Sequence, residues 1–268
     1  MQNTTPVTHY SDGATRKNFR RLLTGFSFIV FGLGSLDLGL IILPLIMLTS
    51  FNKDARRIRI QAAISWHFRT FLRLIQALGL MSLNIQGLEK LKTDKGVIII
   101  ANHPTLIDVV VIMAFLPEVD CVVKEGLNRN IFLRRIVRSA GYITNSNPES
   151  LFSDCKDRLN QGRNIIIFPE GTRSIEGQPL KFQRGVSRIA LLTEHSIRPL
   201  YLKCEPGTLS KQQKWYDIPD KPFVFSMKVG DTIDTQRIIE SDKPISIKTR
   251  QLTRQLEKQY LHKLAETH

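Results

Sequence analysis

The side chains best suited to chemistry lie in two short polar segments, each of which directly follows an apolar run. The first segment, residues 102–108, begins with Asn102 and His103 and ends with Asp108. The second segment, residues 168–174, reads Phe-Pro-Glu-Gly-Thr-Arg-Ser. Both segments are expected where a buried strand ends, at the edge where open α/β sheets bind their ligands.

His103 and Asp108 have the types and spacing of a general base and the carboxylate that orients it. A helix expected to begin near Pro104 or Thr105 would let Asp108 fold back onto the imidazole ring. This contact would fix the tautomer and leave the other ring nitrogen to take a proton. No Ser or Cys stands beside the His in a nucleophile turn, so we expect direct attack by the activated hydroxyl group rather than a covalent enzyme intermediate. We predict no metal site, because further ligands do not lie close by.

The second segment has residue types that hold a phosphate group. Gly171 permits close backbone approach, Thr172 can donate a hydrogen bond, and Arg173 can place two N–H groups on a phosphate. Glu170 is expected to orient these groups rather than to transfer protons. Together, the two segments predict a transferase that activates a hydroxyl group on a phosphate-bearing substrate.

The two segments resemble the motifs of the lysophospholipid acyltransferase family, which includes the glycerol-3-phosphate and 1-acylglycerol-3-phosphate acyltransferases. The family's Asn-His-x4-Asp motif matches residues 102–108, and its Phe-Pro-Glu-Gly-Thr-Arg-Ser motif matches residues 168–174 in full. A basic segment ending in Gly at 181–185 and a Pro-containing strand at 197–200 also fit. The resemblance covers roughly residues 80–205.

The resemblance implies an O-acyltransferase with His103 and Asp108 as its catalytic residues. It would move a fatty acyl group from acyl-CoA or an acyl carrier protein to a lysophospholipid, by default 1-acyl-sn-glycerol-3-phosphate, in phospholipid biosynthesis. The thioester is a co-substrate, and no other cofactor is expected. The residues expected to bind substrate are Asn102, Lys124, Glu170, Gly171, Thr172 and Arg173.

A basic stretch follows the apolar run 119–123. It consists of Lys124, Arg129, Arg134, Arg135 and Arg138. By resemblance, a groove here would take the acyl donor, since positive charge suits the phosphates of coenzyme A or the acidic face of a carrier protein. A solvated or lipid-facing basic helix is the competing interpretation.

One stretch departs from the family pattern. The second motif of relatives usually follows a Gly-aromatic-Ile strand with an Asp-Arg pair, whereas residues 141–145 here read Gly-Tyr-Ile-Thr-Asn. The Arg that helps to hold the acceptor's phosphate is absent. A non-glycerol lyso-lipid such as a lyso-ornithine lipid therefore stays an alternative acceptor. Further alternatives are a CoA-independent transacylase and a non-catalytic membrane-binding protein with the same fold.

The charge balance predicts a polyanionic partner. The chain has 268 residues and a formal net charge of +14. No nucleic-acid-binding motif is apparent, so we expect a lipid membrane and an acidic donor rather than nucleic acid. The three cysteines are far apart, which excludes a disulfide framework and is typical of reducing, cytoplasmic surroundings.

The N-terminal part is predicted to contain membrane-associated helices over residues 16–80, after a polar, disordered stretch at 1–15. Residues 22–51 are apolar except for Asp37, and basic clusters flank them equally. This pattern fits a single span, or a re-entrant hairpin that turns near residues 34–37 with both ends cytoplasmic. A buried core helix is a third possibility. We expect location at the cytoplasmic face of the inner membrane.

Residues 54–79 predict an amphipathic helix with its apolar side chains on one face. Those side chains are Ile60, Ile64, Phe68, Leu72 and Ile75, and Arg57, Arg69 and Arg73 fall among them. The helix could lie on anionic lipid or pack as an ordinary surface helix on the following domain.

Residues 81–268 predict an α/β domain with a mostly parallel sheet flanked by helices, the glycerolipid acyltransferase fold. The expected strands are 97–101, 119–123, 164–168, 197–203 and 222–229. The expected helices are 106–116, 130–139, 148–160, 184–194 and 247–266.

Overall fold

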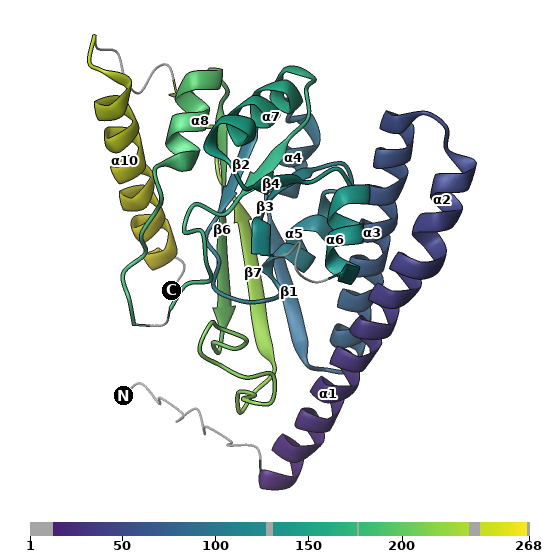
Figure 1. Cartoon of the computed structure of the whole chain (residues 1–268). Helices are drawn as coiled ribbons and strands as arrows, with labels where there is room; N and C mark the ends of the chain where they lie inside the picture. Colours follow the sequence, from purple (N-terminus) through teal and green to yellow (C-terminus); the bar gives the residue numbers. More distant parts are fainter. Residues whose placement is uncertain (1–12, 127–130, 176, 236–241, 267–268) are drawn as a thin grey trace, which may run out of the picture.

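A seven-stranded sheet forms the centre of the molecule in the computed structural model (Figure 1). The structure describes residues 13–126, 131–175, 177–235 and 242–266, so most of the predicted disordered stretch at 1–15 lies outside the described residues. The strands are β1 (Met81–Gln86), β2 (Ile98–Ala101), β3 (Asp120–Lys124), β4 (Ile143–Asn145), β5 (Ile165–Ile167), β6 (Ile197–Glu205) and β7 (Phe223–Val229).

The sheet order is β1-β7-β6-β2-β5-β3-β4, and every neighbouring pair is parallel except β6 with β7. The predicted mostly parallel α/β fold is therefore confirmed. Strand β1 was not predicted, because its alternation of buried and exposed side chains at the sheet edge lacks an apolar run. The carboxyl ends of β2, β5, β3 and β4 meet at one edge.

Helices cover both faces of the sheet. They are α1 (Ala14–Asp37), η1 (Leu38–Ile42), α2 (Leu43–Thr49), α3 (Lys53–Ala77), α4 (Leu88–Thr93), α5 (Asp108–Phe115), α6 (Ile131–Ser139), α7 (Pro148–Asn160), α8 (Gly185–Thr193) and α10 (Ile245–Ala265). Side chains alternate along β2, so that Ile99 packs with α3 and α5 while Ile98 and Ile100 pack with α7, α8 and α10. Two separate apolar cores result, one on each face.

The predicted hairpin turn at residues 34–37 is wrong. Helix α1 continues through it, and η1 and α2 extend the helical path to Thr49. The π-helical turn η1 ends two residues before Pro44, whose ring and missing N–H disfavour regular α-helix there. Asp37, the charge that suggested a turn, lies 3.5 Å from the His67 ring nitrogen of α3. The chain reverses instead just before Asn52, whose side chain caps α3.

Helix α3 packs on the domain with its predicted apolar face. Ile60, Ile64 and Leu72 are buried, and α3 lies along α5. Of the arginines that fall among these side chains, Arg57 is buried, Arg69 donates to the Ala114 carbonyl oxygen at 3.0 Å, and Arg73 is exposed. The surface-helix interpretation is therefore correct for this face, and the lipid-facing interpretation is wrong for it.

The helical rod formed by α1, η1 and α2 leaves much of its apolar surface exposed. Residues Thr15–Thr49 are long and apolar enough to cross a membrane. The large apolar side chains exposed on the rod include Leu22, Ile29, Leu33, Leu45 and Leu48. Contiguous apolar surface of this kind marks contact with lipid or another apolar partner, so the rod fits a membrane anchor.

Candidate active site

The two polar segments meet at the carboxyl edge of the sheet, because β2 and β5 are parallel neighbours. The backbone N–H of His103 donates to Glu170 Oε1 at 2.7 Å. In return, the N–H of Ser174 donates to the His103 carbonyl oxygen at 2.7 Å. The second segment thus holds the backbone on both sides of the imidazole.

His103 and Asp108 form the contact that their spacing predicts. Nδ1 of the imidazole lies 2.7 Å from Asp108 Oδ2. An ionised carboxylate can only accept, so Nδ1 carries the proton and Nε2 keeps a lone pair. The His103 side chain is 18% exposed and that of Asp108 is 0% exposed. The pair can therefore take a proton from a group that approaches the imidazole.

Asp108 is held by the turn that precedes it. Helix α5 begins at Asp108 itself rather than near Pro104 or Thr105. The turn is fixed by Thr105, whose backbone N–H donates to Asp108 Oδ2 at 2.9 Å and whose hydroxyl group donates to Oδ1. Burial raises the pKa of Asp108, and hydrogen bonds from His103 and Thr105 only partly oppose this rise. A buried carboxylate of this kind stabilises the imidazolium that forms when Nε2 takes a proton.

Glu170 joins the two segments, in keeping with the orienting role expected for it. Besides the His103 N–H, it accepts a hydrogen bond from Ser174 Oγ, which lies 2.8 Å from Oε2. Burial raises the pKa of Glu170, and the hydrogen bonds from His103 and Ser174 lower it by less. We infer that the carboxylate mainly sets the position of the His103 backbone.

Asn102 is a correction to the expected substrate-binding set. Its side chain is buried, and its amide nitrogen donates to the Leu202 carbonyl oxygen at 2.8 Å. Its amide oxygen accepts the Leu202 N–H, also at 2.8 Å. Both ends of the amide therefore tie the end of β2 to β6 rather than reach a substrate.

Arg173 lies at the edge of the site and is engaged by the protein. Its Nη1 donates to the carbonyl oxygens of Leu209 and Ser210, each at 3.0 Å. These residues belong to the β6–β7 loop, residues 206–222, which also accepts the Leu106 N–H at 3.0 Å. The loop therefore borders the site, and the contact of Arg173 with a phosphate group stays a prediction.

Gly171 and Thr172 complete the corner that contains Arg173. Gly171 has φ +68°, a conformation that favours glycine, and it is exposed. Thr172 is half-buried. Their contact with an acceptor also stays a prediction.

Lys124 lies at the same edge of the sheet, two strands from β2. It ends β3 and is the register partner of Asn145 on β4. This chain lacks the Arg of the family's second motif, but the exposed Lys124 lies beside the end of the corresponding strand. The structure therefore supplies a nearby cation that the sequence pattern alone did not place there.

The basic stretch expected to form a donor groove lies along α6. Arg134, Arg135 and Arg138 are exposed, and Arg129 lies outside the described residues. Helix α6 packs against η1 through Ile136. These arginines therefore sit beside the N-terminal helices, and the donor groove stays a prediction.

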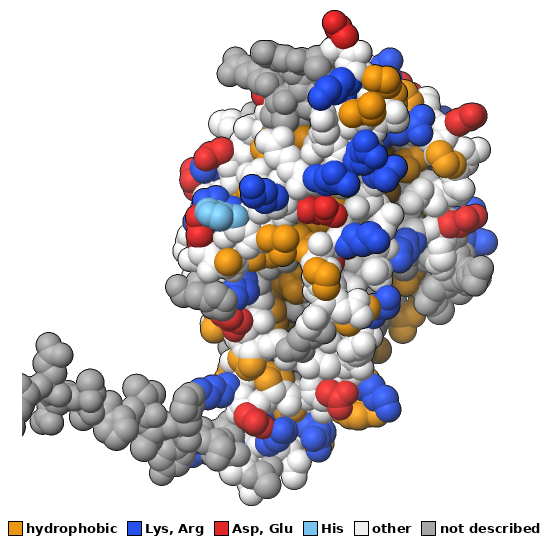
Figure 2. Space-filling model, turned by 90° about the vertical axis from the view of Figure 1, so that its left-hand side faces the viewer, with side chains coloured by type: hydrophobic (Ala, Val, Ile, Leu, Met, Phe, Trp, Pro, Cys, Tyr) orange, Lys and Arg blue, Asp and Glu red, His pale blue; other side chains and the backbone are white. Residues whose placement is uncertain are grey.

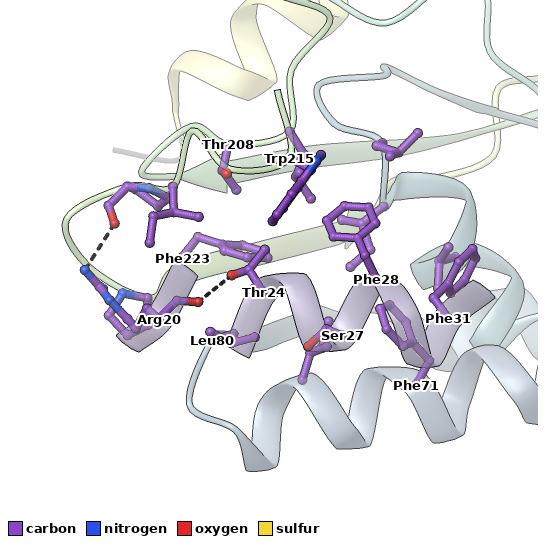
Figure 3. Close-up of a pocket in the computed structure, with 18 of the residues that line it drawn as sticks. Arg20, Thr24, Ser27, Phe28, Phe31, Phe71, Leu80, Thr208, Trp215 and Phe223 are labelled. Atoms are coloured by element: carbon purple, nitrogen blue, oxygen red, sulfur yellow. Dashed lines mark hydrogen bonds between the residues drawn. The ribbon is translucent and has the colours of Figure 1, made fainter. Parts of the chain in front are cut away.

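An apolar cavity of about 200 Å³ opens beside the first segment (Figure 3). Its walls come from α1, α3, the start of α5 and the β6–β7 loop, and include Phe28, Phe31, Phe71, Leu106, Trp215 and Phe223. The sequence interpretation missed it, because four distant segments build it. The aromatic residues of α1 gave a signal, but they were assigned to a membrane segment.

The β6–β7 loop is fastened to α1 as well as to the site. Lys17 Nζ lies 2.6 Å from Asp220 Oδ1, and Arg20 donates to the Pro219 carbonyl oxygen at 3.1 Å. Trp215 packs against Phe28, with their ring centroids 6.1 Å apart. The loop therefore bridges the N-terminal rod and the second segment.

Comparisons with known proteins agree with this architecture. The family profile described as Acyltransferase matches residues 82–203. A 1-acyl-sn-glycerol-3-phosphate acyltransferase of Helicobacter pylori is 33% identical over 130 residues, which cover 45% of this chain and 55% of that protein. The enzyme of the same name from Cocos nucifera is 34% identical over 112 residues, which cover 39% of this chain and 36% of that protein. The chain thus spans about half or less of the length of these relatives.

The fold also matches a solved structure. The crystal structure of PlsC, the 1-acyl-sn-glycerophosphate acyltransferase of Thermotoga maritima, aligns with a TM-score of 0.66. The alignment covers 91% of this chain and 98% of that chain at 17% sequence identity. At this identity, the likeness shows a shared fold.

Proposed function

We propose that this chain, whose residues 82–203 match the Acyltransferase profile, transfers a fatty acyl group from a thioester to the hydroxyl group of 1-acyl-sn-glycerol-3-phosphate. One observation carries the proposal. The His103 imidazole is bonded to a fully buried carboxylate at 2.7 Å and held against the segment 168–174. This arrangement provides a base with a defined tautomer next to groups that can bind a phosphate.

The chemistry follows from the hydrogen bonds. His103 Nε2 takes the proton of the acceptor hydroxyl group, and that oxygen attacks the thioester carbonyl carbon. The C–S bond then breaks as the C–O ester bond is completed, and the imidazolium returns its proton to the leaving thiolate. Asp108 stabilises the imidazolium throughout and keeps Nδ1 protonated.

The apolar cavity supports an acyl chain as the transferred group. Leu106 and Ile107, which follow His103 in the first segment, line its wall. A chain in this cavity would start near the base and extend toward α1, where Phe28 and Phe31 lie. Each buried methylene group contributes about 0.8 kcal/mol, so the cavity favours a long acyl chain over a short one.

Two cations at the carboxyl edge of the sheet support a phosphate-bearing acceptor. Arg173 would read the phosphate after it exchanges the carbonyl oxygens of Leu209 and Ser210 for phosphate oxygens. Lys124, beside Asn145, adds a second positive charge at this edge. A non-glycerol lyso-lipid acceptor is the second candidate, because Asn145 replaces the cationic end of the family's second motif.

Anchoring by the N-terminal rod would place the site at the membrane surface. A helical path of this length measures about 50 Å, longer than the hydrocarbon core of about 30 Å. Because α1 also packs on α3 and walls the cavity, we favour an oblique position within the cytoplasmic leaflet over an upright span. The acceptor, itself a membrane lipid, would then enter from the bilayer.

A product assay tests the proposal. Purified protein in lipid-containing micelles is given palmitoyl-CoA and 1-acyl-sn-glycerol-3-phosphate, and released thiol and diacyl product are measured together. We expect equal amounts of thiol and product, and neither with the His103→Ala variant. Product without released thiol would instead indicate a transacylase. Better use of this acceptor by Asn145→Arg than by wild type would favour the non-glycerol lyso-lipid.

A further inference from the structure

Six basic side chains line one surface of the molecule, on α8, α10 and the segment that leads into α8. We call this surface the α8–α10 face. Its members are Lys181, Arg184, Arg188, Arg250, Arg254 and Lys258, and all six are exposed. On α10, the spacing of four residues places Arg250, Arg254 and Lys258 in one row, while Arg188 lies on α8 and Arg184 is the N-cap residue of α8. Figure 2 shows Lys and Arg side chains spread over this side of the molecule.

The six cations of the α8–α10 face form no ion pair or side-chain hydrogen bond within the described part of the chain. Several cations elsewhere are paired with carboxylates. Arg163 is bonded to Asp120, Arg198 to Asp94, and Lys90 to Asp231, at 2.6–2.7 Å. Glu257, an acidic residue of α10, accepts the Phe182 N–H at 2.6 Å. The positive potential of this face is therefore largely uncompensated locally.

The α8–α10 face is turned away from the apolar rod. In Figure 1, α10 and α8 lie on one side of the sheet, and α1, α2 and α3 lie on the other. Half of the large exposed apolar side chains of the described residues belong to the rod, whereas α8 exposes Leu192 and α10 exposes Ile245 and Leu261. A membrane that receives the rod would not reach these cations, so a water-soluble partner suits them better.

A short path of contacts connects this face with the catalytic edge. The N–H of Gln183 donates to the Pro169 carbonyl oxygen at 2.7 Å, which joins the segment before α8 to the second polar segment. Phe182 packs against Tyr260 of α10, and the Tyr260 hydroxyl group donates to the Ile100 carbonyl oxygen at 2.9 Å. The face therefore begins next to the site, on the side of the sheet opposite the apolar cavity.

We propose that the α8–α10 face docks an acidic protein that carries the acyl thioester on a flexible arm. This inference rests on the proposed acyl transfer and identifies the donor's carrier. The α10 row from Arg250 to Lys258 alone extends for about 12 Å. Exposed cations in rows attract an extended acidic surface and speed its encounter, whereas the phosphates of coenzyme A need only a compact cradle.

The test compares two donors and two charge-reversal variants of the full chain. Variant one carries Arg250→Glu, Arg254→Glu and Lys258→Glu. The matched control carries Lys92→Glu, Lys95→Glu and Lys156→Glu, which change the net charge equally at exposed positions elsewhere. For each protein, KM and kcat are measured with palmitoyl-loaded acyl carrier protein and with palmitoyl-CoA, at low and at moderate salt.

We expect variant one to raise the KM for the carrier-protein donor by at least about tenfold at low salt, with kcat nearly unchanged. Its KM for palmitoyl-CoA should stay within about twofold of wild type, as should both values for the control. The difference in KM for the carrier-protein donor between variant one and wild type should be smaller at moderate salt than at low salt. Equal effects on both donors, or equal effects of both variants, would overturn the docking surface.

A binding measurement keeps the two proposals separable. Fluorescence anisotropy of labelled acyl carrier protein reports docking even if no transfer occurs, and variant one should weaken it while His103→Ala should not. Unchanged binding by variant one refutes the docking surface. Absence of transfer by wild type with either donor refutes the proposed function alone. Preferential loss of DNA or anionic-vesicle binding in variant one would assign the face to those partners instead.

Discussion

The two faces of the sheet are built from alternate residues of the same strands but meet different surroundings. Ile99 belongs to the core under α3 and α5, and Ile98 and Ile100 belong to the core under α7, α8 and α10. Outside the first core lies a rod with exposed apolar side chains, and outside the second lie the exposed cations of the α8–α10 face, which have no ion-pair partner among the described residues. The sheet therefore separates a side with exposed apolar surface from a side with exposed positive charge.

The site lies where this separation ends. His103 directly follows β2, whose residues contribute to both cores, and the apolar cavity opens on one side of it. A lipid acceptor and a water-soluble donor can therefore approach from different directions. The predictions below test whether chemistry, anchoring and substrate binding divide between the faces in this way.

The largest effect is expected at the base. His103→Ala should lower kcat by at least about 100-fold, because the variant lacks the group proposed to take the acceptor's proton. Membrane binding and carrier binding should persist, since neither face loses a residue. Turnover is measured by product formation, and thermal unfolding of the variant checks that it folds. Near-normal turnover by the His103→Ala variant would refute both the mechanism and the assignment of the active site to this edge of the sheet.

Membrane binding should depend on the exposed apolar side chains of the rod and not on the α8–α10 face. Ile29 and Leu33 of the rod are 63% and 60% exposed. Replacing both with Ser should weaken membrane partitioning by about 30-fold, if each loses roughly 1 kcal/mol of apolar burial. The measurement is co-sedimentation with vesicles in high salt.

The matched control for anchoring replaces Ile245 and Leu261 of α10 with Ser, and it should sediment like wild type. Equal release of both variants would contradict the division between the faces. This double substitution is a sharper test than deletion of residues 1–52, because α1 also walls the cavity and would be lost with the anchor.

The sequence was sufficient where a local pattern determines the structure. Apolar runs predicted β2, β3, β5, β6 and β7, and the spacing of His103 and Asp108 predicted their contact. The sequence was insufficient where contacts between segments far apart in the chain determine the position of a side chain. The partner of Asp37 comes from α3 and the partner of Asn102 from β6, so a turn and a substrate contact were predicted in their place.

A smaller effect is expected at the acceptor's phosphate. Arg173→Lys should raise the acceptor KM by about fivefold, because a lysine cannot present two parallel N–H groups, while the donor KM changes little. The same replacement at Arg188, on the α8–α10 face, should leave the acceptor KM unchanged. Steady-state kinetics with each substrate varied in turn would show the difference, and a shift in the donor KM alone would place Arg173 with the donor.

The smallest effect concerns the dependence of stability on pH. Burial raises the pKa of Glu170 in the folded protein, so the folded state binds this proton more tightly than the unfolded chain does. Stability should therefore fall as pH rises from the ordinary range of a Glu carboxyl toward the raised pKa. Glu170→Gln should remove this part of the fall while keeping an oxygen for the His103 N–H. Parallel curves of Tm against pH for the two proteins would contradict this assignment.

The β6–β7 loop connects the residue proposed to bind the acceptor's phosphate with the rod proposed to enter the membrane. Its carbonyl oxygens at Leu209 and Ser210 engage Arg173, and its Asp220 end is fixed to Lys17 on the rod. An anion that binds Arg173 in place of these carbonyl oxygens would remove hydrogen bonds that hold the loop. A shift of the rod would break the contact between Lys17 and Asp220 at the other end of the loop. Thermodynamic linkage then requires reciprocity: by whatever factor lipid insertion alters acceptor affinity, acceptor binding alters lipid affinity equally.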